Sequence, residues 1–244
     1  MNLLKEYIRQ VLQEITTISP HLLEDIEKGL LKSKFWEWPA TTEYWSKTTK
    51  MNYQIERVLR ENLKPQGIYV FVLNAGSGTD DVPKLQSASW DPINKDLKIH
   101  ITPSWKEGVV SFDYQKLIRD ILGVIRHELT HVVQLNVQGR HTELPTTYPS
   151  YGTASYWKSK LESEAYASQL AYSLVKAYGA QASEILKKAF QDNELIPAGF
   201  EFYNWGIFRS LLYNKDPELK ASAKRFLKKT YQYIQQAEEQ GDWS

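Results

Sequence analysis

The segment from Phe112 to Gln138 constrains the fold most, because it combines a long helical repeat with a motif of chemical meaning. Its apolar residues recur every three or four positions, as on the buried face of a helix. His127 and His131 stand four residues apart within it, so a helix presents both imidazoles on one face. Two such histidines can bind one zinc ion, and Glu128 beside them can take a proton from a water molecule there. The sequence therefore predicts a metal centre on this helix.

A third protein ligand is expected, because a catalytic zinc commonly takes three and leaves one position for water. In the extended three-histidine motif, a glycine and a histidine follow three and six residues after the second histidine. Here those positions hold Gln134 and Val137, which excludes that motif. The remaining candidates are His141, in a loop after the helix, and the carboxylates of Glu164 and Glu162.

Glu164 is the preferred third ligand. A helix is expected over residues 156–178, with an apolar stripe that contains Glu164, whereas Glu162 points toward solvent. The stripe consists of Trp157, Leu161, Ala165, Ser168, Ala171, Tyr172 and Val175. A carboxylate on a buried face is costly unless it is paired or binds a metal, and zinc would remove that cost. A buried hydrogen bond or salt bridge is the alternative for Glu164, and Glu162 remains the second choice.

Composition narrows the class of partner. The chain has 244 residues, 42% of them hydrophobic and 24% charged, which are ordinary values for a globular protein. A net charge of +1 gives no reason to expect nucleic acid or an anionic membrane. The absence of cysteine excludes disulfides, thiolate zinc sites and cysteine nucleophiles. Residues 1–16 carry charges among the apolar positions, unlike a signal peptide, and no stretch reaches the length of a membrane span. We therefore expect a cytoplasmic protein.

The rest of the chain is predicted to be helical around a short strand-rich segment. Further helices are expected over residues 2–16, 19–35, 43–62, 181–192, 203–213 and 217–238. Residues 67–74 are apolar on both faces, which is typical of a central strand. Residues 86–90 and 97–102 are predicted to form a hairpin. The second of these strands has one polar face, which suggests an edge strand that could pair with an extended peptide.

His127-Glu-Leu-Thr-His131, followed by Glu164-Ala-Tyr-Ala, resembles the gluzincin branch of zinc metallopeptidases over roughly residues 67–178. The resemblance implies that His127, His131 and Glu164 bind zinc and that Glu128 is the catalytic base of peptide hydrolysis. It also implies a mainly helical α+β zincin-like fold, with a small mixed or antiparallel sheet packed on the motif helix. Many members stabilise the oxyanion with a tyrosine or histidine. Candidate tyrosines here are Tyr148, Tyr151, Tyr166 and Tyr203.

We therefore expect one domain over residues 1–244. It would have a helical layer (1–62), a sheet with the motif helix (67–138) and C-terminal helices that carry the third ligand (156–244). The predicted function is a zinc-dependent metallopeptidase that acts on a peptide or protein. One alternative is a non-catalytic zincin-like domain, in which zinc serves protein interaction, sensing or assembly. Another is a helical interaction protein with a coincidental motif. The long connection between His131 and Glu164 leaves substrate preference and the exact glutamate open.

Overall fold

The computed structural model describes residues 21–37, 44–75, 83–102, 113–137, 153–191 and 205–240. It is mainly helical with a small mixed three-stranded sheet, which confirms the predicted α+β class. The chain divides into two compact units, Met1–Glu128 and Leu129–Ser244, and each is described by itself. The single domain stays a prediction. The helix expected over residues 2–16 lies outside the described residues.

Two helices open the described part of the first unit. They are α2 (Leu22–Ser33) and α3 (Tyr44–Leu63), which confirms the helices predicted in these regions. Buried apolar residues recur along both, as an amphipathic helix requires. Gly29 of α2 permits a close approach to α3, because a Cβ atom there would lie only 2.7 Å from Val58 Cγ1.

The sheet has the order β1-β3-β2, with β1 at Tyr69–Asn74, β2 at Lys84–Asp91 and β3 at Asp96–Thr102. Strands β2 and β3 form the predicted antiparallel hairpin, and β1 runs parallel to β3. Among the strands in the described residues, β1 lies at an edge and β3 is central, which corrects two expectations. Side-chain patterns report which faces of a strand are covered, whereas an edge is defined by backbone pairing in the plane of the sheet. A peptide therefore cannot pair with β3 as expected.

Side chains of helix α3 form hydrogen bonds with backbone groups on the outer edge of β1. The Val72 N–H donates to Glu56 Oε2 at 2.8 Å, and Arg60 Nε donates to the Val70 carbonyl at 3.0 Å. Arg60 Nη2 also lies 3.0 Å from Glu56 Oε1, so the two side chains form an ion pair alongside the strand. Side chains of α3 thus occupy backbone groups that an open edge would offer to another strand.

Helix α4 (Tyr114–Val137) is the predicted motif helix, and the division between the units falls inside it. Its first half carries a buried apolar stripe in the first unit, in keeping with the predicted period. The stripe consists of Leu117, Ile118, Ile121, Leu122 and Ile125. At the start of the helix, Tyr114 stacks on Trp36, with ring centroids 3.9 Å apart.

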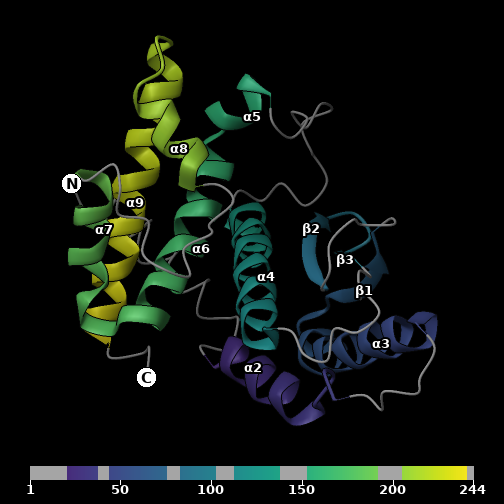
Figure 1. Cartoon of the computed structure of the whole chain (residues 1–244). Helices are drawn as coiled ribbons and strands as arrows, with labels where there is room; N and C mark the ends of the chain where they lie inside the picture. The colour runs from purple at the N-terminus through teal and green to yellow at the C-terminus, as the bar shows by residue number, and fades with distance from the viewer. Residues whose placement is uncertain are drawn as a thin grey trace. The chain divides into compact units, whose positions relative to one another are not determined.

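The second unit is helical in the residues described. Its helices are α5 (Ala154–Lys158), α6 (Lys160–Tyr178), α7 (Ala182–Gln191), α8 (Trp205–Leu212) and α9 (Pro217–Gln240). The three predicted C-terminal helices are confirmed as α7, α8 and α9, while the helix predicted over residues 156–178 is divided into α5 and α6. Figure 1 shows α6 in green beside α9 in yellow, and their facing apolar residues build the core of this unit.

Within the described ranges, we find no helix that has both the length and the apolar character needed to cross a membrane.

Candidate metal centre

The motif residues lie well inside α4 and are buried. His127, Glu128 and His131 are each less than one-tenth exposed. They follow the buried apolar stripe of α4 along the same helix. The two imidazoles and the carboxylate are therefore also removed from water. Burial of such groups is unfavourable unless they are paired or bind a cation. The predicted positions of both histidines on one helix are confirmed.

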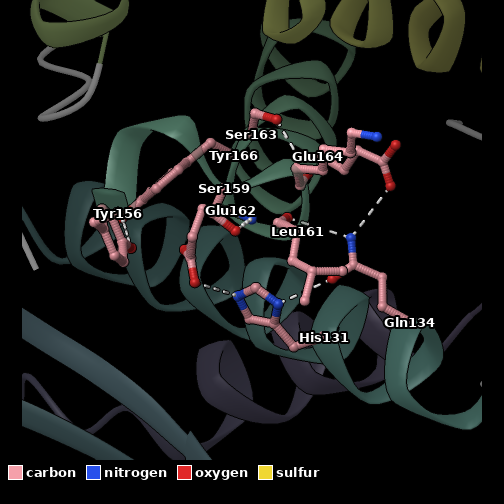
Figure 2. Close-up of polar contacts among 10 residues, drawn as sticks. His131, Gln134, Tyr156, Ser159, Leu161, Glu162, Ser163, Glu164 and Tyr166 are labelled. Carbon is pink, nitrogen blue, oxygen red and sulfur yellow. Dashed lines mark hydrogen bonds and ion pairs between the residues drawn. The ribbon is translucent and has the colours of Figure 1, made fainter. Parts of the chain in front are cut away.

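Glu162 joins the two histidines. His127, His131 and Glu162 each offer one ligand atom, and these atoms lie within 4.8 Å of one another. Glu162 Oε1 is 3.5 Å from His131 Nε2, and the glutamate side chain is only 3% exposed. Figure 2 shows this carboxylate directed at the His131 ring. The three side chains therefore form a buried group with the arrangement of a metal site.

The expectation for the two glutamates is wrong with respect to burial. Glu162, predicted to face solvent, is buried, while the side chain of Glu164 is 29% exposed. Glu164 Oε1 lies 3.3 Å from Lys229 Nζ of α9, so an ion pair compensates its charge. The geometry favours Glu162, the second choice from the sequence. That Glu164 is a ligand stays a prediction.

The break between α5 and α6 explains part of this correction. Ser159 has an extended ψ of 129° and ends the continuous helix on which the predicted stripe was drawn. Its hydroxyl accepts a hydrogen bond from the Glu162 N–H at 3.4 Å, as an N-cap residue does. Glu162 consequently stands in the first turn of α6, where the helix dipole favours a negative charge.

Two tyrosines stand on the far side of Glu162. The hydroxyls of Tyr156 and Tyr166 are 2.8 Å apart, and both tyrosines lie near Glu162 (Figure 2). Burial, followed by the nearby Tyr166 and Glu162, raises the pKa of Tyr156 well above its ordinary value. Tyr156 therefore stays protonated and can donate to the carboxylate. Tyr166, predicted as one of several oxyanion candidates, is part of this buried pair.

Gln134 contacts residues of both α4 and α6. In the sequence it served only to exclude the three-histidine motif, which has a glycine at this position. Its Oε1 lies 3.0 Å from His131 Nδ1. Its Nε2 donates to the Leu161 carbonyl at 3.3 Å and to Glu164 Oε2 at 3.4 Å. The signal was present in the sequence, since residues three apart on a helix are neighbours. Tyr156 gave no such signal, because its contact with Glu162 depends on the break at Ser159.

Other predicted candidates lie outside the described residues. These are His141, the alternative third ligand, and the tyrosines Tyr148, Tyr151 and Tyr203.

The donor set suits a metal ion. Two imidazole nitrogens and one carboxylate oxygen are a ligand combination of catalytic zinc sites. His131 Nε2 and Glu162 Oε1 lie 3.5 Å apart, so a lone pair of a neutral imidazole and a carboxylate oxygen are both available to one cation. The residues present therefore fit a metal ion.

A search of protein-family models found no match for this chain, and comparisons with curated proteins and with solved structures likewise found none.

Proposed function

We propose that this chain is a zinc-dependent metallopeptidase, with His127, His131 and Glu162 as zinc ligands and Glu128 as the general base. The observation that carries the proposal is the buried group of two imidazoles and one carboxylate, with Glu128 adjacent in the sequence to His127. Two histidines and one glutamate leave a fourth position for water in a tetrahedral zinc site. A purely structural zinc site more commonly takes four protein ligands. The expected cytoplasmic location stays a prediction.

The chain's own residues divide the chemistry between them. Zinc, when bound, supplies a Lewis acid that lowers the pKa of water to about 7 and polarises a carbonyl. Glu128 accepts a proton from the attacking water as a carbon–oxygen bond forms at the peptide carbonyl. It then delivers this proton to the leaving amine as the carbon–nitrogen bond breaks. Tyr156, which stays protonated near Glu162, is available as a donor that holds this carboxylate in place.

The test combines metal analysis with cleavage of a broad peptide library. We expect about one zinc per chain after purification with zinc present. Cleavage should disappear on treatment with a chelator and return when zinc is added. Glu128→Gln should lower the cleavage rate by about 10²- to 10⁴-fold, the usual contribution of a general base, while zinc content is unchanged.

Glu184→Gln provides the matched control, because Glu184 is an exposed residue of α7 paired with Lys188 at 2.7 Å. It should keep wild-type zinc content and cleavage. Wild-type protein without zinc, or library cleavage unaffected by Glu128→Gln, would contradict the peptidase. A full complement of zinc with no cleavage would also contradict it and would favour the non-catalytic zinc-binding domain.

A further inference from the structure

The amide of Gln134 has its orientation determined by its neighbours. The Leu161 carbonyl and the Glu164 carboxylate both accept hydrogen bonds, so the NH₂ end of the amide must face them. The carbonyl end then faces His131, with Oε1 at 3.0 Å from Nδ1 (Figure 2). Glu164 is itself held by Lys229, so a chain of polar contacts leads from α9 to the His131 ring.

This orientation selects one tautomer of His131. The Gln134 carbonyl oxygen can only accept, so Nδ1 of His131 must carry the hydrogen. A neutral imidazole has a single N–H, which leaves Nε2 with its lone pair exposed toward Glu162 Oε1 at 3.5 Å. Gln134 thus keeps the hydrogen off Nε2 of His131, although Gln134 is not one of the three residues of the metal group.

We propose that Gln134 is a positioning residue of the metal centre, which fixes the His131 tautomer so that Nε2 can bind zinc. Glu164 and Lys229 hold the Gln134 amide in the orientation that this role needs. The inference rests on the proposed function in one respect, that zinc is the ion bound by Nε2. In this proposal Glu164 does not bind the metal but contacts Gln134, which in turn contacts His131.

Loss of the Gln134 acceptor should favour the wrong tautomer. Without the Gln134 oxygen beside Nδ1, the imidazole gains more by placing its hydrogen on Nε2, where the Glu162 carboxylate accepts it. Zinc would then have to displace this hydrogen before it could bind Nε2. Partners that orient a metal-binding histidine typically contribute about 10- to 100-fold in metal affinity.

The first experiment reads the tautomer without metal. Long-range ¹H–¹⁵N correlation spectra of the zinc-free chain at about pH 8 report which ring nitrogen of His131 is protonated. We expect Nδ1–H in the wild type and a shift toward Nε2–H in Gln134→Leu. Gln235→Leu, at an exposed glutamine of α9 that contacts Tyr231, is the matched control and should keep the wild-type spectrum. If Gln134→Leu does not fold, Gln134→Met removes the acceptor with a more flexible side chain.

The second experiment measures the zinc dissociation constant by competition with a chromophoric chelator. Gln134→Leu should weaken zinc binding by about 10- to 100-fold, and Gln235→Leu should leave it unchanged.

The two proposals fail in different ways. A wild-type His131 with hydrogen on Nε2, or a Gln134→Leu variant that keeps both Nδ1–H and wild-type zinc affinity, overturns the role of Gln134. If the wild type binds zinc and Glu128→Gln is fully active, only the peptidase is lost, and the tautomer measurement still decides the positioning role.

Discussion

Glu162 and Glu164 stand two residues apart on α6, and we expect their substitutions to have different effects on zinc affinity. Glu162 is buried beside His131, so Glu162→Gln removes a charged ligand and should weaken zinc binding by more than about 100-fold. Glu164→Gln keeps an oxygen that can accept from Gln134 and Lys229, so its effect should stay below about tenfold. Chelator competition measures both constants, with Glu184→Gln as the control. The reverse ranking would restore Glu164 as the ligand.

The two histidines were predictable and the glutamate was not, for a physical reason. A spacing of four residues brings His127 and His131 to one face of any helix, whatever surrounds it. Burial on α6 depends on what covers each turn. Glu162, Gln169 and Lys176 share one stripe, yet the first is buried, the second half-buried and the third exposed. Since α6 is covered on most sides near its start, its own periodicity does not identify the buried carboxylate.

At the scale of the elements, periodicity predicted the helices well and the sheet order poorly. Each long helix repeats its apolar residues along its own sequence, so its existence can be inferred locally. The place of β1 at an edge depends instead on α3, whose Glu56 and Arg60 bind the outer backbone groups of that strand. Such contacts join a helix side chain to the backbone of the following strand, so the alternation of side chains along β1 does not reveal them.

The capped edge of β1 gives a stability prediction. Glu56→Ala removes the acceptor of the Val72 N–H and the partner of Arg60. We expect the free energy of unfolding to fall by about 1–3 kcal/mol, the usual effect of leaving one such group unsatisfied. Urea denaturation measures this change. Glu61→Ala, at an exposed position of the same helix that faces Arg57 at 3.9 Å, should change stability by less than about 0.5 kcal/mol. Equal effects of the two variants would contradict the capping role.

At the scale of the whole molecule, the metal centre should act as a stabilising ligand site. Three buried polar side chains converge there. A bound cation would offset the free-energy cost of burying them. A ligand that binds the folded chain alone adds about 2.7 kcal/mol of stability at one hundred times its dissociation constant. For a chain of this length, that corresponds to a rise of roughly 5–10 °C in the melting temperature.

Thermal unfolding with excess zinc and with chelator tests this link, and the variants show which residues carry it. The wild type and Glu184→Gln should both melt at a higher temperature with zinc. Glu162→Gln should lose most of the zinc-dependent rise, because its ligand set is incomplete. Glu128→Gln should keep the full rise, since Glu128, the proposed general base, lies outside the group of His127, His131 and Glu162. A zinc-dependent rise that survives in Glu162→Gln would mean that zinc stabilises the fold from another place, and the ligand assignment would then be wrong.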